Sequence, residues 1–318
     1  MDRKQQDMQF LGLFGIYLES FKILFNFKST FSKITLASIL PLSLIYLAFE
    51  AIKYDPGTQF AKGLIILLIT FVLLVFSLPS TSAVVHAVAS VYTGRDVTFG
   101  NVMTVVRIPK VAKRLMVTSS CTILTFYLYL MVLEFFMVLW RDSFQHVQII
   151  GPVSLFVIVV LYTVGFVYMA VFWQLAHIVS VLEDVKGFEA MAKSRDLLEG
   201  KMWIAVVIFL KLQLVQSGIK ILFKCIPLHT ESSFFSIVPV GRLSFGIAGR
   251  LGFGFLCLLL LMIVFLFGLI FQTVIYFVCK SYHHENIDYS PLSNNLPVYL
   301  DENGPLKAKD VEHEQLDV

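Results

Sequence analysis

The stretch that decides the fold of this chain is LGFGFLCLLLLMIVFLFGLIFQTVIYFVCK, residues 251–280. Leucine and phenylalanine dominate it, and no charged side chain interrupts it before Lys280. A helix crosses the hydrocarbon layer of a bilayer with about 20 apolar residues, and this run is longer. The stretch therefore predicts a membrane-spanning helix.

Five other stretches have the same character, which is typical of an all-α integral membrane protein. Hydrophobic residues form 57% of the 318 and charged residues 15%, against roughly 45–50% and about 25% in soluble proteins. We predict a six-helix transmembrane bundle with spans at 34–52, 63–91, 115–140, 149–182, 202–223 and 251–280. The second, fourth and sixth spans are longer than a bilayer requires, so we expect them to tilt or to run past its surface.

The distribution of basic residues predicts the orientation. With six spans, both termini lie on the same side of the membrane. Of the 25 lysines and arginines, 17 lie on that side, 7 lie on the other, and Lys211 falls inside the fifth span. Because basic residues are enriched in cytosolic loops, we expect both termini in the cytosol. The membrane we expect is that of the endoplasmic reticulum or the plasma membrane.

A short amphipathic segment precedes the first, third and fifth spans on the predicted cytosolic side. The three segments are 10–27, 98–107 and 187–199, and the spans that follow them begin about 80–90 residues apart. This spacing indicates three helical-hairpin repeats, each led by a surface helix. Two interpretations of these helices stay open. They lie at the lipid headgroup boundary, or they pack under the bundle as ordinary cytosolic helices.

The chain divides into three parts. Residues 1–33 form a cytosolic N-terminus with its amphipathic helix, residues 34–280 the membrane domain, and residues 281–318 a polar cytosolic tail. The tail contains prolines and many acidic residues, and it cannot bury enough surface to fold alone, so we expect it to be disordered. The cytosolic helices and the tail are the parts we expect to bind protein partners, beside membrane lipids.

Composition and motifs argue against several classes of function. The net charge of +3 forms no basic patch, so we expect no nucleic acid as a partner. The cysteines are far apart, and His283 and His284 form a lone pair, so we expect no metal and no cofactor. No nucleophile elbow, P-loop or dinucleotide fingerprint occurs, so we expect no enzyme. The acidic pair Glu183 and Asp184 is expected to cap the helix that begins near Gly187.

The cytosolic stretch VSVLEDVKGFEAMAKSRDLLEGKMWIAVVIFL (179–210) has a distinctive order: an acidic pair, a helix with a central serine, then Gly-Lys-Met-Trp at the start of a span. Together with FLGLFGIYLESFKI (10–23), ASVYTGRDVTFGNVM (89–103) and YFVCKSYHHENID (276–288), it resembles an uncharacterised plant family of multi-pass membrane proteins. The part from Ser194 to Trp203 is also distantly similar to the membrane domain attached to bacterial glycerophosphoryl diester phosphodiesterases. The resemblance implies the topology and no enzyme activity.

Polar side chains inside the spans are the candidates for a functional site, because they are costly in lipid. Lys211, Gln213, Gln216 and Lys220 lie in the fifth span, and Glu134 lies in the third. Glu134 and Lys220 are about equally far into their spans and are expected to be able to pair. Such a pair indicates a polar path between helices three and five, or only an interhelical salt bridge with Lys220 reaching toward the surface.

Two further hypotheses concern the cytosolic membrane edge. Cys279 is a candidate for palmitoylation, because a cysteine beside a basic residue at the membrane surface is a common substrate. The basic run Lys110, Lys113 and Arg114 is suited to anionic lipid headgroups, or serves only the inside-positive bias.

We expect a non-enzymatic membrane protein that organises lipids or partner proteins in endomembranes. The alternative is a transporter or channel that uses the polar path between helices three and five. A lipid-modifying enzyme is a third interpretation.

Overall fold

The computed structural model describes residues 10–52, 59–94, 97–106, 108–144, 150–224 and 247–284. Six of its helices are long and apolar enough to cross a membrane, which confirms the prediction of an all-α six-helix bundle. The fifth span covers Met202–Phe223 as predicted, whereas the first begins earlier, at Lys28. The first nine residues and the tail from residue 285 lie outside the described part, so the predicted disorder stays a prediction for 285–318. The first two residues assigned to the tail, Ser281 and Tyr282, instead end the last helix.

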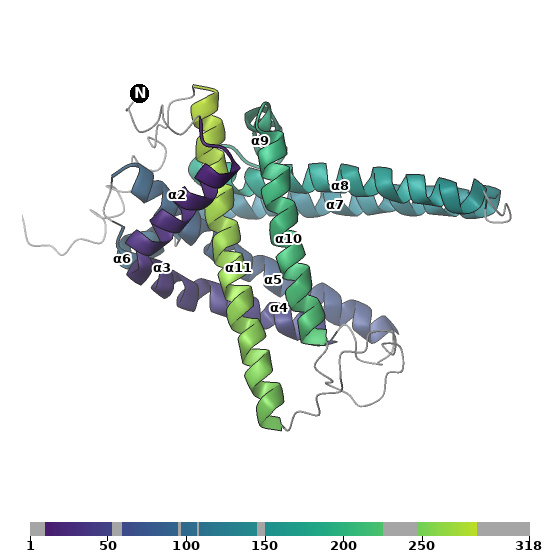
Figure 1. Ribbon diagram of the computed structural model, residues 1–318, viewed down its shortest axis with the longest axis horizontal. Helices are drawn as coiled ribbons and strands as arrows, with labels where there is room; N and C mark the ends of the chain where they lie inside the picture. Colours follow the sequence, from purple (N-terminus) through teal and green to yellow (C-terminus); the bar gives the residue numbers. More distant parts are fainter. Residues whose placement is uncertain are drawn as a thin grey trace, which may run out of the picture.

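The spans form three antiparallel helical hairpins. Figure 1 shows the hairpins meeting at one end of the molecule and diverging toward the other. The helices of each hairpin pack along each other. The hairpin helices are α3 (Lys28–Ile34), the π-helical turn η1 (Thr35–Ile39), α4 (Leu40–Ile52) and α5 (Gln59–Tyr92); α7 (Pro109–Phe144) and α8 (Ile150–Leu182); and α10 (Met202–Lys224) and α11 (Ile247–Tyr282).

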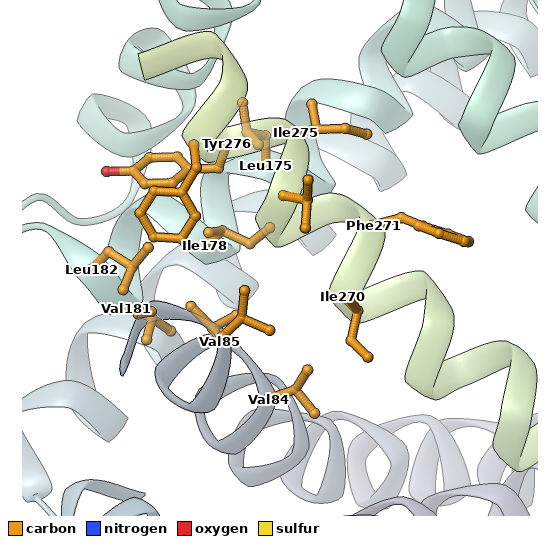
Figure 2. Close-up of a cluster of buried hydrophobic side chains, with 14 of the residues drawn as sticks. Val84, Val85, Leu175, Ile178, Val181, Leu182, Ile270, Phe271, Ile275 and Tyr276 are labelled. Carbon is orange, nitrogen blue, oxygen red and sulfur yellow. The ribbon is translucent and has the colours of Figure 1, made fainter. Parts of the chain in front are cut away.

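The hydrophobic core lies where the three hairpins meet. We call this region the hub; it comprises residues 80–92 of α5, 170–182 of α8 and 270–282 of α11. These second helices of the three hairpins contact one another there, and side chains such as Val85, Ile178 and Ile270 are fully buried between them (Figure 2). Helices associate within a membrane through close van der Waals packing, and the packing of these side chains in the hub holds the three hairpins together.

The first span contains a local distortion with an identifiable cause. Pro41 has no backbone N–H, so the carbonyl of Ala37 lacks its usual helical donor. The helix widens into the π-helical turn η1 immediately before this proline. Pro79 lies inside the facing helix α5, and the neighbouring Ser80 Oγ donates to the Ser38 carbonyl at 3.0 Å. The hydroxyl thereby joins the two helices at the point where each contains a proline.

The three predicted surface segments are helices and lie beside the hub. They are α2 (Leu13–Asn26), α6 (Phe99–Val106) and α9 (Phe188–Leu198), and each precedes one hairpin in the chain. Helix α2 packs on α11, α6 packs on α5, and α9 packs on α8. The described chain therefore begins and ends at the hub, because both α2 and the last turn of α11 lie there (Figure 1).

Candidate functional site

The strongest concentration of charge in the described chain surrounds Glu183, directly after the end of α8. Its Oε1 accepts hydrogen bonds from the Tyr276 hydroxyl at 2.6 Å and from Lys280 Nζ at 2.8 Å. Its Oε2 pairs with Lys193 Nζ at 2.6 Å. One carboxylate thus joins the end of α8 to the surface helix α9 and to the last turns of α11.

The neighbouring Asp184 joins the same region to α7. Arg114 Nη1 donates to Asp184 Oδ1 at 2.6 Å and to the Glu183 carbonyl at 2.7 Å. Lys110 Nζ lies 3.9 Å from the same Asp184 oxygen. The Arg114 side chain is only 9% exposed. It therefore lies buried beside the hub and is not available to a lipid headgroup, contrary to the suggestion made for the basic run.

The expected capping role of Glu183 and Asp184 is therefore wrong. The N-cap of α9 is Gly187, which makes no side-chain capping bond, and the acidic residue in the first turn is Glu189. The two carboxylates instead neutralise basic side chains from other helices. A single sequence does not reveal this, since Arg114 and Lys280 lie about 70 and 100 residues away along the chain.

Gly187 begins α9 in a conformation that glycine alone adopts readily, with φ 62° and ψ −131°. Its N–H donates to Thr118 Oγ1 at 2.8 Å, and that hydroxyl lies 2.6 Å from Ser180 Oγ. A Cβ at Gly187 would approach Cys121 Sγ to 3.3 Å. The backbone of the turn is thereby fixed against α7 without room for a side chain.

Helix α9 and the Gly-Lys-Met-Trp motif after it (residues 200–203) are both fixed to neighbouring helices. The central serine of α9, Ser194, is buried and donates to the Phe172 carbonyl of α8 at 3.1 Å. Gly200 has φ 85° and lies against the Tyr282 ring, over which Lys201 Nζ sits 5.1 Å from the centroid. Trp203 is exposed, as suits an indole at the boundary between lipid and water.

The bonds to Glu183 determine its charge. Burial alone would raise the pKa of this carboxyl, but the hydrogen bonds from Lys193, Lys280 and Tyr276 outweigh burial and hold the pKa below its ordinary value of 4.5. The carboxylate is therefore ionised at neutral pH. Both of its oxygens are occupied by these partners, so the arrangement is suited to locking helices together and not to proton transfer.

This lowered pKa predicts a dependence of stability on pH. A carboxyl whose pKa is lower when folded stabilises the protein above its unfolded pKa, and the contribution is lost as pH falls through the folded pKa. We expect the thermal unfolding temperature of the purified protein in detergent to fall below about pH 4.5. The Glu183→Gln variant should be less stable at pH 7 and show a flatter profile in that range. Parallel profiles for both proteins would contradict the assignment.

The polar side chains of the fifth span face the first hairpin and α2. Lys211 Nζ lies 5.4 Å from the ring centre of Tyr17. Lys220 Nζ lies 5.2 Å from the ring centre of Tyr46, whose hydroxyl accepts a hydrogen bond from Gln216 at 3.2 Å. Gln213 is half-buried on the same helix. The tyrosines rest edge-on against phenylalanines of α11.

Glu134 lies apart from these residues. It is exposed on α7, and no ion pair between Glu134 and Lys220 is found in the described part of the chain. The reason is the divergence of the second and third hairpins away from the hub (Figure 1). Equal distance along two spans places side chains at similar depth, but it does not make the two helices neighbours.

Cys279 lies inside the hub, with no exposed surface. Attachment of an acyl chain at this position would require the end of α11 to open, so palmitoylation of Cys279 stays a prediction. Deeper between α8 and α11, Gln272 Nε2 donates to Gln174 Oε1 at 2.8 Å. The pocket beside these glutamines encloses about 20 Å³, which is room for about one water molecule.

The outward faces of the three surface helices differ. On α2 most are aromatic or aliphatic: the exposed fractions of Phe14, Leu18 and Phe25 are 81%, 71% and 68%, and the exposed polar side chains are Lys22 and Asn26. On α6 the exposed residues are Gly100, Asn101 and Thr104. On α9 they are polar or small apart from Phe188; the others are Glu189, Ala192, Arg195 and Asp196.

Six apolar helices in three hairpins, with a charged hub at one end, define a multi-pass helical membrane protein. In the described residues, no three His, Cys, Asp or Glu side chains lie close enough together to hold a metal ion. Over residues 1–55 and 58–316 the chain matches the family described as Domain of unknown function (DUF8558). The chain belongs to this family. No curated protein and no solved structure matches it.

Proposed function

We propose that the chain is a non-enzymatic membrane protein that organises lipids around α2, on the cytosolic side of an endomembrane or the plasma membrane. The observation that carries this proposal is the row of exposed apolar side chains on α2. Phe14, Leu18, Phe21 and Phe25 recur every three or four residues, so they share one side of the helix. In water such a row would be unfavourable, whereas in the headgroup region it is suited to contact with acyl chains.

The inner side of α2 is fixed to the protein. Ile16, Ser20 and Ile23 are buried, and Tyr17 packs edge-on against Phe271 with ring centres 4.9 Å apart. A helix held on one side and apolar on the other presents a rigid surface to lipid. The two interpretations of the surface helices therefore apply to different helices. Packing under the bundle suits α6 and α9, and a position at the lipid headgroup boundary suits α2.

The basic residues support the orientation that this function needs. The hub lies on the side of the bundle to which 17 of the 25 lysines and arginines are assigned, so the inside-positive rule favours a cytosolic hub and cytosolic termini. The alternative, a transporter with a polar path between helices three and five, receives less support. The side chains of α10 that would line the path contact Tyr17 and Tyr46 instead.

The proposal predicts where lipid contacts the full chain. In vesicles that contain a phospholipid with a photoactivatable acyl chain, irradiation should attach lipid to the peptide that contains α2 and not to the peptides of α6 and α9. Replacing Phe14, Leu18 and Phe25 by Ser should remove most of this labelling, because each apolar side chain contributes about 1.5–3 kcal/mol to burial in lipid.

The matched control is Phe188→Ser, which removes the exposed phenylalanine of α9. It should leave the labelling of α2 unchanged. Equal labelling of α2 and α9 in the unaltered protein would count against lipid organisation by α2. Labelling that persists in the triple variant would show that the exposed apolar side chains are not what binds the lipid.

A further inference from the structure

Glu134 is a carboxylate at membrane depth on a helix surface that no other part of the described chain covers. It lies within the span of α7, it is exposed, and it makes no ion pair or hydrogen bond with the residues that the structure describes. Charged side chains inside a membrane are rare and generally pair with an opposite charge. Glu134 therefore requires a basic partner from outside its own hairpin.

The surface around Glu134 is a continuous apolar face. Tyr127, Met131, Phe135 and Val138 are exposed on the same side of α7, at the spacing of one helical face. The hairpin of α7 and α8 extends away from the other two (Figure 1), so this face is open along the part of the helix that is remote from the hub.

Lys220 on α10 has the opposite charge and a matching position. Near the hub end of their helices lie Arg114 on α7 and Lys201 just before α10; Glu134 lies 20 residues beyond Arg114, and Lys220 lies 19 residues beyond Lys201. At 1.5 Å per residue these separations are about 30 Å and about 28 Å along the two helices. Lys220 is half-exposed, and no described carboxylate lies within 4.0 Å of its Nζ, which contacts the face of Tyr46.

The helix surface beside Lys220 is also open. Leu214 and Ile221 are exposed, and Ser217, three residues before Lys220 and next to it on the helix surface, is exposed as well. Small residues let a second helix approach closely within a membrane. The small Ser217 beside Lys220 leaves room for the large side chains around Glu134, so the two surfaces are compatible in size and opposite in charge.

We propose that a second copy of this chain covers this surface, with Glu134 of each copy paired to Lys220 of the other. Within one chain the two hairpins diverge, so one copy cannot make the pair. With a two-fold axis along the membrane normal, the dimer forms the pair of Glu134 and Lys220 twice, which is the self-complementary arrangement of most homodimers. Because α7 and α10 both run outward from the hub, they run parallel across this interface, and Met131 of one copy lies level with Ser217 of the other.

The test uses two differently tagged full-length chains expressed in the same membrane and purified through one tag. The unaltered chains should co-purify. Glu134→Lys alone and Lys220→Glu alone should each reduce self-association at least tenfold, because every pair then joins like charges. Mixing a Glu134→Lys chain with a Lys220→Glu chain should restore association. In the mixed dimer, position 134 of each chain again faces a side chain of opposite charge at position 220 of the other.

The matched control is Lys211→Glu, which reverses the other lysine of α10 at about 15 Å from Lys201. Mixed with Glu134→Lys, it should restore less association than Lys220→Glu does, because only one of the two pairs then joins opposite charges. A lipid or an unrelated protein that satisfied the two charges separately would not respond to which variants are mixed. Failure of the mixture to restore association, single variants that associate normally, or a monomeric unaltered chain would each overturn the proposal.

A second measurement needs no charge reversal and so does not depend on how those variants fold. A Met131→Cys chain co-expressed with a Ser217→Cys chain should give an oxidation-dependent dimer that contains one of each. Either variant expressed without the other should give no disulfide-linked dimer through position 131 or position 217. Absence of the mixed dimer in membranes where both chains are folded would also overturn the proposed interface.

Discussion

Replacing Glu183 by Gln is expected to lower the free energy of unfolding by about 3–5 kcal/mol. Removing one member of a buried ion pair leaves its partner charged and without compensation, and losses of this size are typical. The partner here is Lys280, whose side chain is only 9% exposed. The amide keeps one oxygen that can accept from Tyr276, but its NH2 group stands where the oxygen paired with Lys193 was. Thermal or denaturant unfolding of the purified protein in detergent measures the effect.

Two further variants test the cause. Glu189→Gln removes an exposed carboxylate from α9 and should change stability by less than about 0.5 kcal/mol. Combining Glu183→Gln with Lys280→Met should recover part of the loss, because the buried ammonium that faced the carboxylate is then removed as well. If Glu183→Gln and Glu189→Gln destabilise equally, the ion cluster does not hold the hub together.

Replacing Gly187 by Ala is expected to cost about 2–3 kcal/mol. The residue has φ 62° and ψ −131°, a region where any side chain strains the backbone by about 1–3 kcal/mol. Gly187 is buried, and the added methyl would press on Cys121 and Val117. Because the turn between α8 and α9 positions Glu183 and Lys193, we expect the same variant to weaken the charged cluster.

The control for this substitution is Gly254→Ala on α11. That glycine is helical, and an added Cβ meets nothing within 4 Å. Alanine is the better helix former by up to about 1 kcal/mol, so stability should stay the same or rise slightly. Equal losses at Gly187 and Gly254 would show that the backbone conformation at Gly187 is not the cause.

The elements of this fold could be predicted from the sequence because each has its own periodicity. A span is recognised by a run of about 20 apolar residues, and the fifth span was predicted at its observed bounds of Met202–Phe223. The segments that became α2, α6 and α9 alternate apolar and polar residues at helical spacing. Both signals are local, so one chain is enough to find them.

The contacts between elements could not be predicted in the same way. Glu134 and Lys220 were expected to be able to pair on the basis of equal depth, which says nothing of which helices are neighbours. Glu183 was assigned to the nearest helix start, whereas its partner Lys280 lies 97 residues away. The hint that was present is Lys280 itself: a lysine that ends a long apolar span at the same membrane edge is a natural partner for a carboxylate there.

The lengths of the hairpin helices have a consequence for the membrane itself. Helices α7 and α11 have 36 residues each, or about 54 Å of helix, whereas the hydrocarbon layer is about 30 Å thick. Because the hub fixes one end of each hairpin, we expect the excess length to be taken up by leaning or by running past the membrane surface. To the extent that the hairpins lean, a thinner bilayer should spread their free ends apart and a thicker one should draw them together. We then expect the lateral area of the protein to change with bilayer thickness.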